Sequence, residues 1–405
     1  MTSEFFHKGF RAFNAGHWPS LLGAWLHFQV GCMVWLLIGA LGIAISTELG
    51  LSATQKGFLV ATPLLGGALL RIVVGPFADH FGAKNVGLGL LGLEGLALLM
   101  GWGFGTTYLQ MLGTGLLLGF AGASFAIALP IASQAYPAEH QGLAMGVAAI
   151  GNSGVFVATF FAPRLAEMVG WHGTFGVMII PVALTALIFW YVVPATPHRQ
   201  PPPGVNQIQG AIRQAISQRF MYWLCFLYAV TFGGFVGLSS FLPIYFHDQF
   251  QFDMVTAGTL TAFCGLAGSL ARPLGGYVAD RLGGLSLLPA IFPLLTFVSV
   301  MLGLAVASEF VIFLLLVLLT SLGFGNGVVF QVASIRYQHV MGTATGLIGA
   351  AGGIGGFFLP SAFGIIKDLT GSYESGFYVF GCLAFFATVS VWVAQKNFKT
   401  LVQRT

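Results

Sequence analysis

Charged side chains are scarce in this chain of 405 residues. Asp, Glu, Lys and Arg together make up 7% of it, whereas about 25% is usual in soluble domains. This shortage excludes an ordinary soluble domain, and a net charge of +4 provides no basic face for a nucleic acid. Hydrophobic residues make up 57% of the chain, and this composition predicts a protein embedded in a lipid bilayer.

The sequence also lacks the residue patterns of metal centres and common catalytic sites. Neither an HExxH pattern nor a GxxxxGK(S/T) phosphate loop occurs, and the histidines are scattered. The cysteines fall in apolar segments without metal-ligand spacing, which favours a packing role: Cys32, Cys225, Cys264 and Cys382. We therefore expect no metal ion, no cofactor and no enzymatic activity.

Apolar runs of about 20 residues or more, long enough to span a bilayer, can be placed twelve times. Their approximate ranges are 21–45, 54–77, 84–104, 107–133, 142–166, 172–193, 220–246, 254–279, 285–306, 309–335, 343–367 and 374–395. The first run is too long and starts too late for a cleavable signal peptide, so we interpret it as the first span. The sequence thus predicts an all-α membrane protein with twelve transmembrane helices.

The positions of the lysines and arginines predict the orientation of these spans. Basic residues collect in the cytoplasmic loops of membrane proteins. If both termini are cytoplasmic, most basic residues outside the spans lie on that side, and only Lys56, Arg164 and Lys367 lie on the other. We therefore expect an integral protein of the plasma (inner) membrane with both termini in the cytoplasm.

A polar, proline-rich segment, 194–219, divides six predicted spans from the other six. It separates an N-terminal half, 1–193, from a C-terminal half, 220–405. The two halves share sequence features: LGFAGASF (118–125) parallels LGFGNGVVF (322–330), and GLAMGVAAIGNSGVF (142–156) parallels GTATGLIGAAGGIGGF (342–357). We interpret the halves as structural copies.

Arg71 and Arg272 occupy matching places in the two halves, each inside an apolar run and each eight residues before an aspartate, Asp79 or Asp280. An arginine in hydrocarbon costs about 2.5–3.5 kcal/mol on insertion scales, so a repeated pair indicates a function. Among the acids, only Glu94 lies well within a predicted span, and one acid cannot neutralise two arginines in different halves. We therefore expect an anion to bind at these arginines.

Two parallel six-helix halves describe the architecture of the major facilitator superfamily, in which substrate binds between the halves near the membrane midplane. The segment GPFADHFGAK (75–84) resembles the loop signature of that superfamily. The resemblance implies the major facilitator fold. It also implies a cytoplasmic gate in which Asp79 and its repeat counterpart Asp280 lie near Lys84 and Arg281. The alternative for this loop is a cytoplasmic anchor that does not move.

A narrower resemblance covers essentially the whole chain, to the nitrate/nitrite porter family of the NarK type. It rests on the two arginines and on AAIGNSGVFVA (148–158) and GAAGGIGGFFLP (349–360), which are similar to the paired nitrate signatures of the family. The resemblance implies a substrate site that includes Gly151, Asn152, Gly154, Gly352, Gly353 and Gly355. Because Gly353 stands where the first signature has Asn152, we expect an amide contact from one half only.

The expected substrate suits the two arginines chemically. Nitrate is flat and has three acceptor oxygens, so planar guanidinium groups can hold its edges. Phe125, Tyr228 and Phe232 are expected to form walls of the pocket, and by resemblance Tyr228 corresponds to a substrate-contacting tyrosine. The alternative is that these rings pack in an aromatic-rich membrane core, and that Asn152 joins neighbouring helices by a hydrogen bond.

Alternating access with exchange of nitrate for nitrite is the mechanism that we favour, because few titratable groups accompany the arginines. This function would serve nitrate assimilation. Proton-coupled nitrate symport is the alternative, with Glu94 and His27 as candidate proton carriers. A nitrate-binding membrane sensor and a transporter of another small anion, such as phosphate, are further alternatives. We expect nitrate, nitrite and the lipid bilayer as partners, and a monomer as the functional unit.

Overall fold

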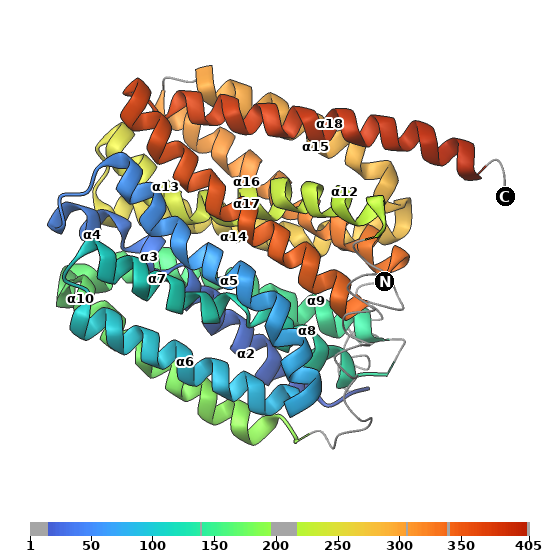
Figure 1. Ribbon diagram of the computed structural model, residues 1–405, viewed down its shortest axis with the longest axis horizontal. Helices are drawn as coiled ribbons and strands as arrows, with labels where there is room; N and C mark the ends of the chain where they lie inside the picture. Colours follow the sequence, from blue (N-terminus) through green and yellow to red (C-terminus); the bar gives the residue numbers. More distant parts are fainter. Residues whose placement is uncertain (1–14, 138–139, 196–216, 305–306, 338–340, 403–405) are drawn as a thin grey trace, which may run out of the picture.

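The computed structural model describes residues 15–137, 140–195, 217–304, 307–337 and 341–402. These residues form helices joined by short turns, with no strand among them. Figure 1 shows the helices running side by side in a bundle, with the start of the first helix and the end of the last helix at the same end. We call the opposite end of the bundle, where α4 and α5 are joined, the distal end.

The first predicted span is helical but broken into three pieces. These are α2 (Trp18–Trp35), α3 (Leu37–Ala40) and α4 (Gly42–Glu48). The breaks fall at Leu36 and Leu41, whose ψ angles of 6° and 3° depart from the α-helical value of about −42°. The N-terminal half continues through α5 (Ala53–Phe81), α6 (Ala83–Phe104), α7 (Tyr108–Gly122), α8 (Phe125–Gln134), α9 (Gln141–Ala149), the 3-10 segment η2 (Ile150–Ser153) and α10 (Gly154–Val192).

The long helix α10 contains two membrane spans. A straight helix of its 39 residues would be roughly 58 Å long, about twice the hydrocarbon thickness of a bilayer. At Gly170 the backbone has φ 74° and ψ 162°, a non-helical conformation that glycine tolerates, so two helices meet there. The predicted spans 142–166 and 172–193 lie on either side of this residue.

The C-terminal half repeats the arrangement of six spans. Its helices are α12 (Arg219–Tyr228), the π-helical segment η3 (Ala229–Gly233), α13 (Gly234–Phe250), α14 (Met254–Leu282), α15 (Gly284–Leu304), α16 (Ser308–Arg336), α17 (Met341–Thr370) and α18 (Glu374–Val402). Residues 196–216, most of the predicted linker, lie outside the described residues, so the division at 194–219 stays a prediction.

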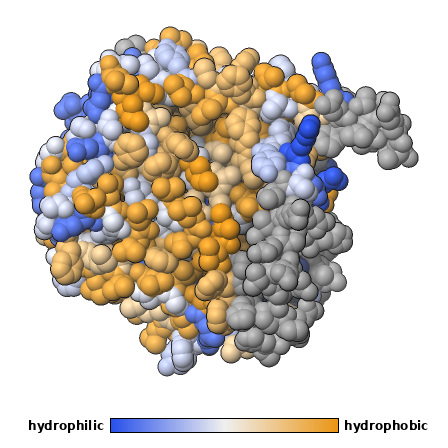
Figure 2. Space-filling view, viewed as in Figure 1, coloured by the Kyte–Doolittle hydropathy of each residue, from blue (hydrophilic) through white to orange (hydrophobic). Residues whose placement is uncertain are grey.

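The described chain accounts for the twelve predicted spans. Ten continuous helical segments are long and apolar enough to cross a membrane, and one of them is Ala144–Val192. Dividing that segment at Gly170 and adding the broken first span gives twelve. Apolar residues cover the middle of the face shown in Figure 2, and hydrophilic residues gather at its distal edge on the left. Exposed rings such as Trp190, Phe297 and Phe358 fit a surface that faces lipid.

The matching helices α5 and α14 show the relation between the halves most clearly. Each has 29 residues, begins after a side chain that caps its first turn, and ends at a glycine with positive φ. The capping residues are Ser52 and Asp253, whose side chains accept hydrogen bonds from backbone N–H groups three residues later. Arg71 lies 18 residues after Ala53, and Arg272 lies 18 residues after Met254. The two arginines therefore have equivalent depths.

The halves meet along two helix pairs, α5 with α17 and α10 with α14. The first pair is so close that a Cβ atom on Gly57 would lie 2.4 Å from the backbone oxygen of Pro360. Small residues allow such close approach between membrane helices. In Figure 1, α5 and α17 lie side by side at the centre of the bundle.

Polar contacts close the distal end between the halves. The Nζ atom of Lys56 on α5 lies 2.8 Å from an oxygen of Asp248 on α13, and Asp248 also accepts a hydrogen bond from the hydroxyl of Tyr373. The carboxylate of Asp368 on α17 accepts hydrogen bonds from the first backbone N–H groups of α5, at Ala53 and Thr54. Acids of the C-terminal half thus hold the start of an N-terminal helix.

Candidate functional site

Both arginines are buried at the contact between the halves. Arg71 is 3% exposed and Arg272 is 6% exposed, so neither side chain faces lipid. Within the described part of the chain, the one ion pair is that of Lys56 with Asp248, so neither arginine contacts a carboxylate. A buried charge without a counter-ion is unfavourable unless hydrogen bonds or a ligand compensate for it.

The Arg71 guanidinium bonds to backbone oxygens on both sides of the site. Its Nε atom donates to the carbonyl of Gly122 at 2.9 Å, at the end of α7. Its Nη1 atom donates to the carbonyl of Gly349 at 3.1 Å, in α17 of the other half. These two bonds fix the orientation of the guanidinium group.

The Arg272 guanidinium is less completely bonded. Its Nη2 atom donates to the hydroxyl oxygen of Tyr228 at 3.3 Å. Its Nη1 atom is buried and has no hydrogen-bond partner among the described residues. Buried polar groups in native proteins nearly always have partners, so an unpaired guanidinium nitrogen indicates a place for a ligand or water.

Aromatic rings surround the two cations. The guanidinium carbon of Arg71 lies 5.1 Å from the ring centre of Phe232 and 5.7 Å from that of Phe125. The same carbon of Arg272 lies 5.7 Å and 5.2 Å from those two centres. Distances below about 6 Å are typical of cation–π contacts. Because both arginines share the two rings, the cations of the two halves lie close together.

Two further aromatic residues, which were not among those expected from the sequence, belong to this cluster. The ring centre of Trp35 lies 4.9 Å from the Arg71 guanidinium, and that of Phe330 lies 5.6 Å from the Arg272 guanidinium. Phe330 could have been found, because it ends the repeat LGFGNGVVF as Phe125 ends LGFAGASF. Trp35 follows no repeated pattern that we identified.

Tyr228 and Phe232 form one wall of the cluster. Their rings are 5.0 Å apart and nearly parallel, at 4°. They lie on either side of the start of η3, where the helix widens into a π-helical turn, a feature that is frequent at functional sites. Gly352 packs directly against both rings, since a Cβ atom there would lie 2.7 Å from Tyr228 and 2.8 Å from Phe232.

Asn152 lies on the 3-10 segment η2, where the helical path of the fifth span changes. It is 1% exposed, and its Nδ2 atom has no hydrogen-bond partner among the described residues. Its backbone oxygen accepts a hydrogen bond from Ser269, which lies three residues before Arg272 on α14. Asn152 is therefore next to the helix that carries the second arginine.

Comparison with known proteins identifies the family. Residues 24–360 match the model of the Major Facilitator Superfamily. The chain belongs to this superfamily. A bacterial homologue of the human lysosomal transporter Spinster, solved in an inward-facing and occupied conformation, has the same fold, with a TM-score of 0.67 at 17% identity and coverage of 95% of this chain and 96% of that one.

Within the superfamily, the chain belongs to the NarK-type nitrate/nitrite porters. It is 32% identical to the probable nitrate/nitrite transporter NarK2 of Mycobacterium tuberculosis (strain ATCC 25618 / H37Rv), over 86% of this chain and 88% of that protein. It is 31% identical to the nitrite extrusion protein of Bacillus subtilis (strain 168), over 94% and 95%. It is 30% identical to the probable nitrate/nitrite antiporter NarK1 of Thermus thermophilus, over 95% and 92%. The family consists of transporters, so the chain is a transporter and not an enzyme.

The glycines of the two porter signatures occupy different surroundings. Gly151 and Gly154 pack against α2 of their own half, at Phe28 and Gln29. Gly355 packs against Ala229 of its own half, whereas Gly353 faces Ala68 on α5 of the other half. Of these glycines, Gly352 is the one that contacts rings beside the arginines. A contact of the others with substrate stays a prediction.

Glu94 and His27, the candidate proton carriers, are buried inside the N-terminal half. The carboxylate of Glu94 accepts one hydrogen bond, from Ser124 at 3.2 Å, and its other oxygen has no partner among the described residues. His27 lies with Nε2 3.0 Å from the carbonyl oxygen of Gly87. Both residues are 0% exposed, and neither forms an ion pair with an arginine in the described part of the chain.

The predicted gate residues of the superfamily loop lie at the end opposite to the distal end. Lys84 donates a hydrogen bond at 2.6 Å to the carbonyl of Trp190, and the guanidinium of Arg281 lies 4.4 Å from the ring centre of Tyr277. Asp280 is exposed. The side chain of Asp79 lies outside the described residues, so its contacts stay a prediction.

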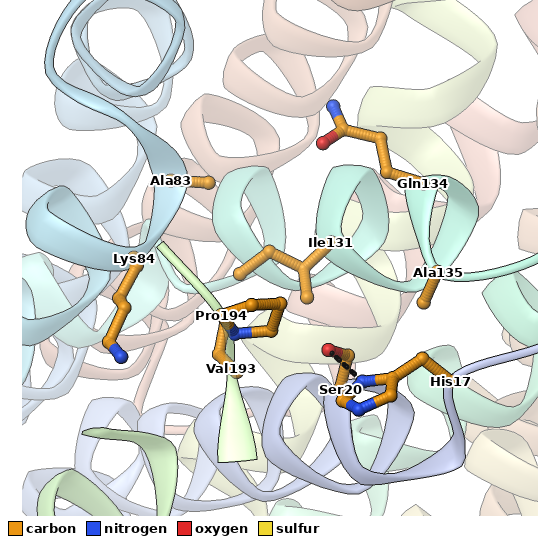
Figure 3. A pocket seen from close by; sticks show the side chains of 9 residues that line it. All are labelled: His17, Ser20, Ala83, Lys84, Ile131, Gln134, Ala135, Val193 and Pro194. Atoms are coloured by element: carbon orange, nitrogen blue, oxygen red, sulfur yellow. Dashed lines mark hydrogen bonds between the residues drawn. The ribbon is translucent and has the colours of Figure 1, made fainter. Parts of the chain in front are cut away.

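A separate pocket opens at the same end of the N-terminal half (Figure 3). It is bordered by His17, Lys84, Gln134 and Pro194, and His17 Nδ1 lies 2.8 Å from Ser20 Oγ. This pocket contains neither arginine. No group of three or more histidine, cysteine or acidic side chains that could hold a metal ion occurs among the described residues.

Proposed function

We propose that this porter carries nitrate and nitrite across the membrane, with the anion held between Arg71 and Arg272. The observation that carries the proposal is the pair of buried guanidinium groups, one from each half, that share Phe125 and Phe232 and contact no carboxylate in the described chain. An anion between them would supply the missing negative charge. The names of the relatives, which are nitrate/nitrite transporters and a nitrite extrusion protein, support nitrate or nitrite as that anion.

The shape of the site favours a flat anion. Tyr228 and Phe232 present parallel rings, and Gly352 lets the backbone of α17 lie against them. A guanidinium offers donors in one plane, which match the planar edge of nitrate or nitrite better than a tetrahedral phosphate. The electronegative ring faces serve as walls, and they also stabilise the guanidinium groups.

We propose that the distal end faces the outside of the plasma (inner) membrane and that both termini are cytoplasmic. The placement of basic residues supports this orientation. The distal contacts between Lys56 and Asp248 then form an outer closure, and transport requires them to break. The halves 1–193 and 220–405 would rock about the site, with 194–219 as their linker. One chain supplies both arginines, so a monomer is sufficient.

Exchange is the transport mode that fits the charges of the site. Two cations close together repel one another, and a bound monovalent anion offsets this repulsion. A loaded carrier would therefore reorient more readily than an empty one, which couples entry of nitrate to exit of nitrite. The gate formed by Asp79, Lys84, Asp280 and Arg281 would control access from the cytoplasm.

Transport by the purified protein in proteoliposomes tests this function. We expect labelled nitrate to enter, internal nitrite to accelerate its entry, and external nitrite to compete better than phosphate. Binding of nitrate without uptake would instead indicate a sensor. Uptake of nitrate that internal nitrite does not accelerate would contradict exchange and leave transport intact.

Proton-coupled symport is a second candidate because of Glu94. Its carboxyl group is buried, accepts one hydrogen bond, and has no cation beside it among the described residues. In symport, this group would take up a proton in one conformation and release it in another that exposes it to water. Nitrate accumulation driven by an imposed pH gradient, without nitrite inside, would support symport over exchange.

A further inference from the structure

Asn326 is a buried polar residue whose side chain lacks hydrogen-bond partners in the described part of the chain. It lies in the middle of α16 and is 0% exposed. Neither its Nδ2 nor its Oδ1 atom has a hydrogen-bond partner among the described residues. A buried amide usually bonds a neighbouring membrane helix, and here it does not. The residue therefore needs another explanation.

The position of Asn326 directs it towards the arginine site. A Cβ atom on the preceding residue, Gly325, would lie 3.0 Å from Thr231 in η3, and a Cβ atom on the following residue, Gly327, would collide with the backbone oxygen of Arg272. Successive helical residues point about 100° apart, so Asn326 points between these two directions. It thus faces the space between η3 and α14.

The next turn of α16 confirms this direction. Phe330 follows Asn326 by four residues and therefore shares its side of the helix. The Phe330 ring contacts the Arg272 guanidinium at 5.6 Å and the Tyr228 ring at 4.9 Å. Asn326 lies one helical turn before Phe330 on the same side of α16, and we infer that it faces the region between the helices that carry Arg272 and Tyr228.

Three unpaired donors belong to α14 or to the segments α16 and η2 that pack against it. They are Nδ2 of Asn326, Nδ2 of Asn152 and Nη1 of Arg272, all buried and all without partners among the described residues. Asn152 is tied to α14 through the hydrogen bond from Ser269 to its backbone oxygen. Each of these three N–H donors lacks a hydrogen-bond acceptor, and nitrate and nitrite offer only acceptors.

We propose that Asn326 is a ligand of the transported anion, with its side-chain N–H group donating to an anion oxygen. This inference rests on the proposed function. It also changes the expectation from the sequence, in which an amide contact comes from one half only. Asn152 supplies the amide of the N-terminal half from the fifth span, and Asn326 supplies that of the C-terminal half from the tenth span.

The variant Asn326→Leu tests the proposal, because leucine has a similar volume and no donor. For a ligand, we expect a nitrate dissociation constant about tenfold higher, as for a lost hydrogen bond to an ion, together with unchanged or higher thermal stability without anion. Asn326→Asp should bind nitrate still more weakly, because it places an acceptor or a negative charge where a donor is needed. Asn85→Leu, at an exposed position outside the site, is the matched control and should behave like the native protein.

Nitrate-dependent shifts of the melting temperature and uptake in proteoliposomes provide the two measurements. If Asn326→Leu and Asn326→Asp bind nitrate as the native protein does, the proposal is wrong. If Asn326→Leu lowers the melting temperature without anion and leaves nitrate affinity unchanged, Asn326 is a structural helix contact. Absence of nitrate binding by the native protein would instead overturn the proposed function itself.

Discussion

The Nη1 atom of Arg71, on the N-terminal half, donates a hydrogen bond to the backbone oxygen of Gly349 on the C-terminal half, 3.1 Å away. One of the two cations in the site is therefore itself a contact between the halves. Rocking of the halves must break or redirect this bond, so the donor that holds the closed arrangement is also a donor that an anion could engage.

Replacement of either arginine by lysine should abolish most transport. Arg71→Lys and Arg272→Lys keep the charge but lose the planar fork and at least one charge-assisted hydrogen bond, each worth about 1.5–3 kcal/mol. We expect nitrate uptake to fall about 100-fold, with little change in yield. Arg336→Lys, at an exposed position at the end of α16, is the control and should transport normally. Normal uptake by both site variants would contradict the anion site.

Tyr228→Phe should distinguish the contribution of the Tyr228 hydroxyl from that of its ring. The change removes the acceptor of the Arg272 bond and keeps the stack against Phe232. Loss of one such bond corresponds to about 1 kcal/mol, so we expect KM for nitrate to change several-fold with an unaltered melting temperature. Tyr228→Ala should affect both quantities. Equal KM values for native protein and Tyr228→Phe would show that the hydroxyl has no part in binding.

Lys56→Gln should shift the protein towards opening at the distal end. The ion pair with Asp248 joins the halves and is partly buried, and we assign it about 1 kcal/mol, or about a fivefold change in the closed population. Distances between spin labels on the distal ends of α4 and α17 would measure this shift. Lys367→Gln is the matched control at the same end, because Lys367 contacts the Tyr373 ring within its own half. The swapped pair Lys56→Asp with Asp248→Lys should restore closure.

Asp253 should make the stability of α14 depend on pH. Hydrogen bonds from the Thr256 hydroxyl and the Thr256 backbone N–H lower the pKa of this carboxyl group below its ordinary value. A lowered folded-state pKa stabilises the fold above the unfolded-state pKa, and this contribution disappears as the pH falls through the folded-state pKa. Asp253→Ala should cost about 1 kcal/mol at pH 7, and the difference from the native protein should shrink in acid, because a protonated carboxyl group is a weaker acceptor than a carboxylate. Thermal unfolding in detergent at several pH values measures this, and a difference of the same size at every pH would exclude the mechanism.

Glu94→Gln should leave exchange intact. The amide keeps the shape of the side chain and the hydrogen bond from Ser124, and no described cation depends on a negative charge at Glu94. We expect nitrate–nitrite exchange within about twofold of the native rate, because glutamine has nearly the size and shape of glutamate and keeps an acceptor oxygen for Ser124. The pH profile of uptake should also be unchanged. A flattened profile would favour symport.

Much of the fold can be predicted from the sequence, because each segment that crosses the bilayer must be apolar over about 20 residues. Apolar length predicts spans, and the repeats around Arg71 and Arg272 predict two related halves; the structure and the family comparison confirm the fold. The breaks at Leu36 and Leu41 were not predictable from apolarity, since leucine is apolar and favours helices.

The sequence pointed to several residues that the structure brings together around the two arginines, and whether they bind substrate stays a prediction. The residues of this cluster that the sequence did not reveal differ in kind. Phe330 was within reach through the repeat that contains Phe125. Trp35 was not, because its role depends on its position beside Arg71. Asn326 stands between two glycines, a pattern that suggests tight helix packing, and its lack of partners becomes evident only when the neighbouring helices are in place.

The hydrogen bonds at the start of α5 offer a way to measure how often the distal end opens. Its first two amide groups, at Ala53 and Thr54, are bonded to Asp368, a residue of the opposite half. Each separation of the distal ends would therefore release these amides to water, where their hydrogens exchange with deuterium. Deuterium uptake at these two amides, measured by mass spectrometry, would therefore report opening at the distal end without any attached label.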